Sequence, residues 1–234
     1  ATIYAHAIRS AQLAAAVKMD TLFADILQSL IIAVLRSGSC FFVPKHFTLR
    51  RKKIMTTIAI ANQKGGVGKT TTTVNLAAGL VSLGKRVLCL DFDPQCHLAK
   101  YLGHTHDNGV TITDFIAAKA SYMDMPSTEG LIRHGVAGID FIPASLRLSR
   151  AETMLAQAMF RERVLRDILE EIVPEKYDYL LIDCNPSMGV LLTNALVAAD
   201  RVLIPVQTEE FSLDGLEDMV DLIQMVREKI NPRL

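Results

Sequence analysis

The stretch KGGVGKTTTT, residues 64–73, carries two lysines five positions apart with three glycines between them. Glycines let the main chain adopt positive φ and approach an anion closely. Lys69 and Thr70 follow the last glycine, and a lysine and a hydroxyl are the side chains that bind phosphate oxygens and Mg²⁺ in such loops. The stretch therefore predicts a phosphate-binding loop. It also raises the question of why a second lysine, Lys64, stands at the start of that loop.

This loop departs in one place from the common phosphate-loop pattern G-x-x-x-x-G-K-[ST]. Gly68 begins the second half of the pattern, but Gln63 stands where the first glycine is expected. The alternative is a glycine turn with a surface lysine, and the β-branched run before the loop and the helical pattern after it argue against that alternative. The candidate phosphate-binding residues are Lys64, Gly65, Gly66, Val67, Gly68, Lys69, Thr70 and Thr71.

Carboxylates stand at the ends of two other hydrophobic runs. Asp91 and Asp93 end the run RVLCLDFD, and Asp183 ends the run YDYLLID. Carboxylates at such places can hold Mg²⁺ beside a nucleotide, directly or through water. A second interpretation stays open for Asp91 and Asp93, because a carboxylate beside Pro94 can also cap a helix.

Strands that alternate with helices must position these residues. Hydrophobic runs predict strands at 56–63, 86–93, 138–145, 177–183 and 201–207. Helical patterns predict a helix that begins at residue 70 and is stopped by Gly84, and further helices at 111–120, 146–156, 160–172, 189–199 and 212–230. This alternation specifies an α/β fold with a mostly parallel sheet flanked by helices on both faces. Ligands of such sheets bind beyond the carboxyl ends of the strands, so the glycine loop and the three aspartates should converge on one site.

Composition limits the classes of partner. Basic and acidic residues balance at 25 each, so the chain has no global basic field that would draw it to nucleic acid. Four cysteines are scattered without the spacing of metal ligands, which favours reduced thiols in a cytosolic protein.

Residues 1–54 differ in composition from the rest of the chain. The spacing of Ala, Leu and Ile over residues 11–35 predicts a helical extension, whose longest apolar run, SLIIAVL, is too short to span a bilayer. The basic cluster RRKK before Met55 reads as a solvated charge run or as a membrane or nucleic-acid patch. A third interpretation is favoured by the composition shift: Met55 is the natural start, residues 1–54 lie outside the native protein, and residues 55–234 form one domain.

Residues 64–77, KGGVGKTTTTVNLA, resemble the deviant Walker A motif of the ParA/MinD family of ATPases. LDFDPQ, YDYLLIDCNPS and VLIPVQTEEFSLDGL resemble further segments of that family, in the same order. The resemblance covers residues 55–234 and is strongest to the ParA/Soj branch. It implies a P-loop ATPase of weak intrinsic activity with ATP and Mg²⁺ as cofactors, whose C-terminal strands and helix would follow the position of Leu234.

The resemblance implies roles for three catalytic residues. Lys69 binds the β- and γ-phosphates of the nucleotide in its own subunit. Lys64 reaches across an ATP-dependent homodimer to the partner's nucleotide, where a second cation stabilises the charge that develops on the γ-phosphoryl group. Asp93 positions the attacking water.

Further residues are assigned to the cofactors by the same resemblance. Thr70, Asp91 and Asp183 hold Mg²⁺, directly or through its water shell, and Gln95 binds the nucleotide from the first switch. Gln207 and Glu209 match polar positions of the family near the nucleotide, although Glu209 could equally begin a helix.

The sequence also departs from the family pattern. Cys96 and His97 follow Gln95 where the family has Gly and Asn, and Asn185 replaces the first of two prolines after Asp183. The first departure leaves Asp93 in place but bears on the flexibility of the first switch and on the hydrolysis rate, and Asn185 implies a more flexible second switch. Cys184 invites comparison with related iron–sulfur proteins, but no second cysteine lies at a matching distance. The pair His104 and His106 is interpreted as surface histidines.

Two functions are compatible with the resemblance. The first is a partitioning ATPase, cytoplasmic and associated with the nucleoid, which forms an ATP-dependent dimer, binds DNA non-specifically and is stimulated by a ParB-like centromere-binding protein. Its DNA contacts would lie in the region beyond Leu234, and no membrane binding is expected. The alternative is a MinD-like or other nucleotide-gated positioning module. A truncated chain that cannot complete its sheet is a third possibility.

Overall fold

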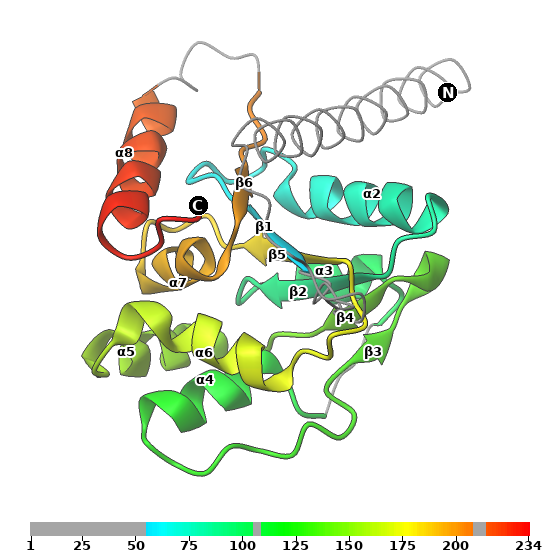
Figure 1. Ribbon diagram of the computed structural model, residues 1–234, viewed down its shortest axis with the longest axis horizontal. Helices are drawn as coiled ribbons and strands as arrows, with labels where there is room; N and C mark the ends of the chain where they lie inside the picture. Colours follow the sequence, from blue (N-terminus) through cyan, green and yellow to red (C-terminus); the bar gives the residue numbers. More distant parts are fainter. Residues whose placement is uncertain (1–54, 105–108, 208–213) are drawn as a thin grey trace, which may run out of the picture. The chain divides into compact units, whose positions relative to one another are not determined.

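The computed structural model describes residues 55–104, 109–207 and 214–234, which belong to one of the two units of the chain, Ile54–Leu234. The predicted extension at residues 1–54 lies outside the described residues. Within the described part of the chain, one six-stranded sheet has the strand order β3-β4-β2-β5-β1-β6. Helices pack against both of its faces (Figure 1). The predicted α/β fold with a mostly parallel sheet is confirmed.

All of the strand pairs are parallel except β3 with β4. The strands are β1 (Thr56–Ile60), β2 (Val87–Phe92), β3 (Arg133–His134), β4 (Asp140–Ile142), β5 (Tyr179–Cys184) and β6 (Arg201–Leu203). The three longest, β1, β2 and β5, lie side by side in the sheet. They are nearly continuous runs of buried apolar residues, as expected for strands that are covered on both faces.

Among the helices of the described residues, two cover one face of the sheet and five contribute to the core on the other. The helices are α2 (Lys69–Ser82), α3 (His97–Tyr101), α4 (Ile112–Ala120), α5 (Leu148–Gln157), α6 (Val164–Ile172), α7 (Val190–Ala198) and α8 (Asp214–Lys229), with short 3-10 turns η1 (Val136–Gly138) and η2 (Arg161–Arg163). Helices α2 and α3 pack with one hydrophobic cluster, and α4 to α8 pack with the other. None of the helices in the described parts has the length and apolar character needed to cross a membrane.

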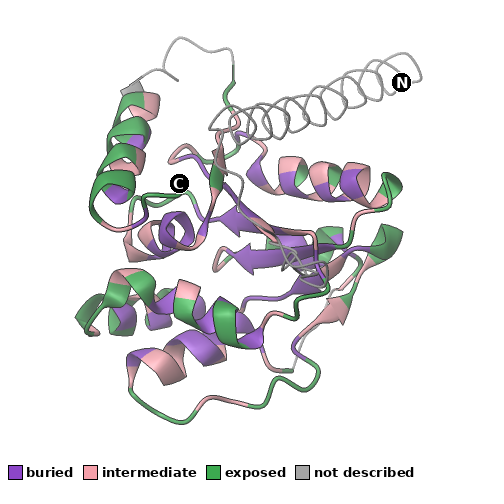
Figure 2. Ribbon diagram, viewed as in Figure 1, coloured by how far each residue is buried: buried purple, intermediate pink, exposed green. Residues whose placement is uncertain are grey.

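Alternation along β1 shows how the sequence fills both clusters. Ile58 and Ile60 contribute to the cluster under α2, whereas Ala59 and Ala61 contribute to the cluster on the other face. Successive side chains of a strand point to opposite faces, so a single strand serves two cores. Figure 2 shows the result, with buried residues concentrated in the central strands and on the inner sides of the helices. Each large apolar side chain buried in this way stabilises the fold by about 1.5–3 kcal/mol.

Several predicted boundaries were wrong, for local reasons. Helix α3 and strand β3 were not predicted. The helix predicted from residue 160 begins at Val164, because Phe160 has φ 54° and cannot continue a right-handed helix. The last predicted strand ends at Leu203 rather than at residue 207, because Pro205 has no N–H to donate to a sheet ladder.

A buried asparagine on α7 fixes the start of α6. The side chain of Asn194 is fully buried. Its Oδ1 accepts a hydrogen bond from the N–H of Leu165 at 2.9 Å, and its Nδ2 donates to the carbonyl oxygens of Arg161 at 2.7 Å and Val190 at 2.8 Å. The N-terminal N–H groups of a helix have no partner inside the helix, so Asn194 satisfies one of these groups on α6 from a neighbouring element.

Replacing Asn194 by Ala should lower the free energy of unfolding by about 1–3 kcal/mol, because the N–H of Leu165 and the carbonyl of Arg161 lose a buried partner. Urea unfolding followed by circular dichroism measures the change. The matched control is Asn75→Ala, since Asn75 is exposed and bonds only within α2; it should change stability by less than about 0.5 kcal/mol. Equal stabilities of the two variants would contradict the role of Asn194.

Candidate functional site

The three central strands bring the predicted site residues to one edge of the sheet. Strand β5 lies between β1 and β2. In the strand register, Asp183 stands opposite Ile60 on one side and opposite Asp91 on the other. The glycine loop follows β1, so the loop and the two aspartates meet at the carboxyl ends of these strands.

Backbone conformation explains the glycines of the loop. Gly66 has φ 76° and Gly68 has φ 86°, values that only glycine adopts without strain. A Cβ added at either position would meet no atom of the chain within 4 Å. The loop therefore needs glycine for its backbone shape and leaves open space beside it. Helix α2 begins at Lys69, directly after Gly68, and the positive end of its macrodipole lies at this loop.

Lys69 is buried inside the loop. Its side chain is 8% exposed, and its Nζ donates a hydrogen bond to the carbonyl oxygen of Lys64 at 3.0 Å. Burial lowers the pKa of Lys69, while the nearby carboxylates of Asp183 and Asp93 act in the opposite direction. The structure thus places a cation where the loop would hold a phosphate.

Asp183 faces two hydroxyls of α2. Its Oδ1 accepts a hydrogen bond from Oγ1 of Thr73 at 3.4 Å, and Thr70 also donates a side-chain hydrogen bond to it. Burial raises the pKa of Asp183 to about 6. Its Oδ2 is buried and has no hydrogen-bond partner. Thr73 was not predicted, although its position four residues after Lys69 places both on one side of the helix.

This donor set fits Mg²⁺. A threonine hydroxyl and a carboxylate with an unpartnered oxygen are hard oxygen ligands, and Mg²⁺ beside a nucleotide takes few protein ligands because it keeps waters and binds phosphate oxygens. In keeping with this, the described residues contain no group of three His, Cys, Asp or Glu side chains that could hold a metal alone.

Asp91 is fully buried and faces the backbone of the turn that follows β2. Its Oδ1 accepts a hydrogen bond from the N–H of Asp93 at 3.3 Å, and its Oδ2 accepts one from the N–H of Ala99 at 3.4 Å. Burial, and then the neighbouring charge of Asp183, raise the pKa of Asp91 to about 8. Both oxygens of Asp91 are therefore engaged by amides of the turn and of α3.

Asp93 and Gln95 lie within this turn. Oδ1 of Asp93 accepts a hydrogen bond from the N–H of Gln95 at 2.9 Å, and its carbonyl accepts one from the N–H of Cys96 at 3.0 Å. Cys96 has φ 53°, in the left-handed region, and precedes α3. The departure from the family pattern at Cys96 thus falls on a residue with strained backbone, at a cost of about 1–2 kcal/mol.

Other predicted residues have different surroundings. Gln207 donates a hydrogen bond from Nε2 to the carbonyl oxygen of Gly66 at 3.2 Å, so it contacts the loop. Asn185 is buried, and its side-chain oxygen has no hydrogen-bond partner. Nε2 of His104 lies 3.2 Å from the carbonyl oxygen of His134, which is not a residue of the glycine loop. The predicted residues Glu209 and His106 lie outside the described residues.

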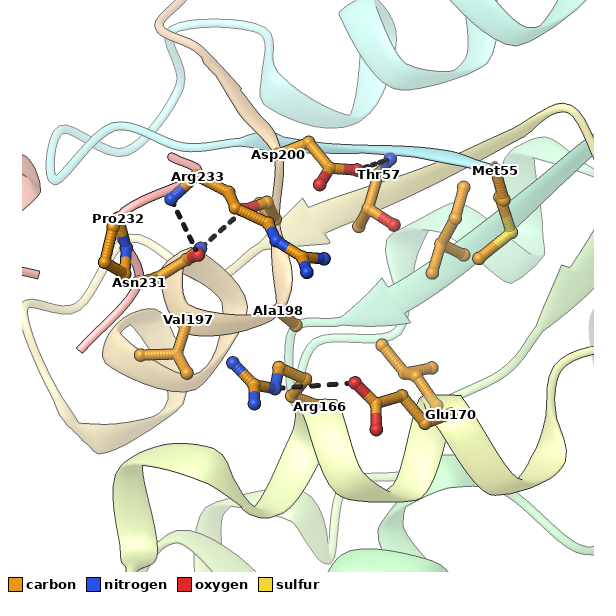
Figure 3. A pocket seen from close by; sticks show the side chains of 13 residues that line it. Met55, Thr57, Arg166, Glu170, Val197, Ala198, Asp200, Asn231, Pro232 and Arg233 are labelled. Carbon is orange, nitrogen blue, oxygen red and sulfur yellow. Dashed lines mark hydrogen bonds and ion pairs between the residues drawn. The ribbon is translucent and has the colours of Figure 1, made fainter. Parts of the chain in front are cut away.

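A cavity of about 320 Å³ lies elsewhere in the domain and contains none of the predicted site residues. Figure 3 shows it near the start of β1, with Met55 and Thr57 on one side and Arg166 and Glu170 of α6 on the other. Asn231, which follows α8, also lines it and donates hydrogen bonds to the carbonyl oxygens of Leu196 and Ala199. The cavity is separate from the glycine loop.

Comparison with known proteins gives one consistent family. A model described as an AAA domain matches residues 55–234. The chromosome partitioning protein ParA of Caulobacter vibrioides is 44% identical over 180 residues, which are 76% of this chain and 65% of that protein. The sporulation initiation inhibitor protein Soj of Bacillus subtilis is 43% identical over 178 residues, which are 76% of this chain and 68% of that protein. The chain therefore spans about two thirds of the length of these relatives.

A solved structure is similar to this chain in sequence and fold. Cobyrinic acid a,c-diamide synthase from Mycobacterium smegmatis, with a bound ATP analogue and magnesium, has a TM-score of 0.70 and 35% sequence identity, and the match covers 77% of this chain and 72% of that one. Sequence, fold and the arrangement of the glycine loop thus lead to the same conclusion: the chain belongs to the AAA domain family and, within it, to the ParA and Soj proteins.

Proposed function

We propose that this chain binds and hydrolyses ATP as a ParA/Soj-type subunit that acts in chromosome or plasmid partitioning. The observation that carries this proposal is the convergence of Lys69, Thr70 and Asp183 at the carboxyl ends of β1 and β5. A buried lysine, a hydroxyl at a helix start and a buried carboxylate at a neighbouring strand end are the parts that phosphoryl transfer requires.

Lys69 and the amides of residues 65–71 bind the phosphates, and Thr70 and Asp183 hold Mg²⁺. When bound, Mg²⁺ neutralises charge on the phosphate oxygens. Its charge also favours the ionised form of Asp183, against the effect of burial. Asp91 contributes to this site through the water shell of the metal or by holding the turn before α3.

Asp93 orients the attacking water, and Gln95 holds Asp93 in its turn through a backbone hydrogen bond. Lys64 supplies the second cation, in the active site of a partner subunit. An additional positive charge beside the γ-phosphoryl group accelerates its transfer, as an arginine finger does. Dimerisation then depends on the triphosphate, because ADP offers Lys64 no γ-phosphate.

Partitioning requires more than nucleotide turnover. The ATP dimer binds DNA non-specifically, a centromere-binding protein of the ParB type stimulates hydrolysis, and the protein works in the cytoplasm on the nucleoid. The chromosome partitioning protein ParA of Caulobacter vibrioides supports the partitioning role by its name. The balanced charge of this chain means that DNA binding needs a local basic surface in the assembled dimer.

Lys69→Ala should weaken binding of Mg²⁺-ATP by at least about 100-fold, because the phosphates lose a charge-assisted hydrogen bond and a buried cation. Isothermal titration calorimetry measures the affinity. Lys229→Ala is the control, since Lys229 is exposed in the last turn of α8, and it should bind as the unaltered chain does. Retained affinity in Lys69→Ala would contradict the assignment of the site.

Asp93→Ala should keep ATP affinity within about threefold but lower turnover by about 100-fold or more, the range for loss of a group that handles the proton or water. Phosphate release measures turnover, and size-exclusion chromatography should show an ATP dimer that persists. The exposed Asp221 on α8 provides the control Asp221→Ala. Unchanged turnover in Asp93→Ala would remove Asp93 from the mechanism.

Lys64→Ala should bind ATP but fail to dimerise, because the contact with the partner's γ-phosphate is lost. Light scattering with ATP and with ADP measures the dimer. Lys100→Ala is the control, since Lys100 is an exposed lysine of the neighbouring helix α3. A dimer of normal strength in Lys64→Ala would overturn the cross-subunit role of Lys64. Binding of the unaltered protein to liposomes would instead favour a positioning module.

A further inference from the structure

The start of the phosphate loop is tied to the chain that follows β6 by a buried asparagine. Asn62 is 8% exposed. Its Nδ2 donates a hydrogen bond to the carbonyl oxygen of Pro205 at 2.8 Å, and its Oδ1 accepts one from the N–H of Lys64 at 2.9 Å. Both ends of the amide are used, so the orientation of this side chain is fixed by its partners. Pro205 is distant in sequence, and no pattern in the sequence predicts this contact.

Two further side chains join the same parts of the chain. Gln63 donates a hydrogen bond from Nε2 to Oδ2 of Asp218 on α8 at 3.4 Å, and it packs so closely that a Cβ on Gly215 would lie 2.5 Å from its Nε2. Gln207 contacts the carbonyl of Gly66 from the other direction. Three hydrogen bonds therefore link residues 62–66 to Pro205, Gln207 and Asp218. The bond from Asn62 to Pro205 is the shortest of the three, and Asn62 is buried.

The consequence for Lys64 is specific. The N–H of Lys64 donates to Asn62, and the carbonyl of Lys64 accepts from Nζ of Lys69 at 3.0 Å. Its backbone is thus held on both sides, and the direction in which a side chain leaves the backbone follows from the backbone conformation. Lys69 is needed for the phosphates themselves, whereas both hydrogen bonds of the Asn62 side chain serve to hold the start of the loop.

We propose that Asn62 is a positioning residue for Lys64, which it holds in the orientation that a cation acting on a partner's γ-phosphate requires. This inference rests on the proposed function of Lys64. An asparagine suits the task because one side chain both accepts from the loop and donates to Pro205, whereas alanine does neither. A group displaced by about 1 Å from its productive position can cost about 100-fold in rate, so a residue that only positions another can control turnover.

A double-mutant cycle on turnover tests this inference in the full chain. Asn62→Ala should lower kcat by about tenfold with ATP affinity within about twofold, and it should have no further effect when Lys64→Ala is already present, because two residues that act as one unit are not additive. Gln224→Ala, which removes an exposed amide on α8, is the control and should leave both values unchanged. An equal loss in both backgrounds, or a loss of ATP affinity together with kcat, would overturn the inference.

A second variant and a second measurement keep the test decisive. Asn62→Ser retains an acceptor for the amide two residues later, so it should recover part of kcat, and it replaces Asn62→Ala if the latter fails to fold. If Lys64→Ala leaves turnover unchanged, the proposed cross-subunit role of Lys64 fails by itself. Hydrogen exchange of the Lys64 amide then decides on Asn62: exchange at least about tenfold faster in Asn62→Ala supports the positioning, and unchanged exchange refutes it.

Discussion

Strand β5 is hydrogen-bonded to β1 on one side and to β2 on the other, in a parallel register that sets Asp183 level with Ile60 and with Asp91. The rest of the candidate site depends on this pairing. A shift of one residue would turn Asp183 to the other face of the sheet, away from the hydroxyls of α2. The apolar residues of β5 resist such a shift, because each would leave its own hydrophobic cluster.

The same arrangement concentrates charge in a region with little water. Asp91, Asp183 and Lys69 are all buried at one edge of the sheet. Burial disfavours the charged form of each group, which is why the pKa values of both aspartates are raised and that of Lys69 is lowered. Neighbouring opposite charges partly offset this cost. A phosphate beside Lys69 and a metal cation beside Asp183 would further offset the cost of burying these charges. The electrostatics of the site thus favour the same ligands as its donor atoms do.

Much of the fold could be predicted from the sequence, because its long strands and most of its helices carry strong patterns. The elements that were missed are short: β3 has two residues and α3 has five, too few to show a period. The helix predicted from residue 160 begins only at Val164, because Phe160 has a left-handed conformation that its residue type does not indicate. The hydrophobic and helical patterns of the sequence therefore predicted most helices and strands correctly but placed their ends poorly.

At the site, the loop and the strand-end aspartates were found from residue type and spacing, and the fold brings them together as expected. The side chains that support them were not found. Asn62 bonds to Pro205 across 143 residues of sequence, and such contacts exist only after the sheet has formed. The alternative interpretation of Asp91 as a helix cap did anticipate one of its contacts, since its Oδ2 accepts a hydrogen bond from the N–H of Ala99 in the first turn of α3.

The hydrogen bond from Lys69 to the carbonyl of Lys64 has a consequence for selectivity. That carbonyl is an internal competitor, since a phosphate must displace it before the lysine can change partner. A weakly charged anion gains little from the exchange, whereas a polyphosphate with its metal gains several charge-assisted contacts at once. Discrimination against simple anions is in this way built into the backbone of the loop, before any contact with the base or the sugar is made.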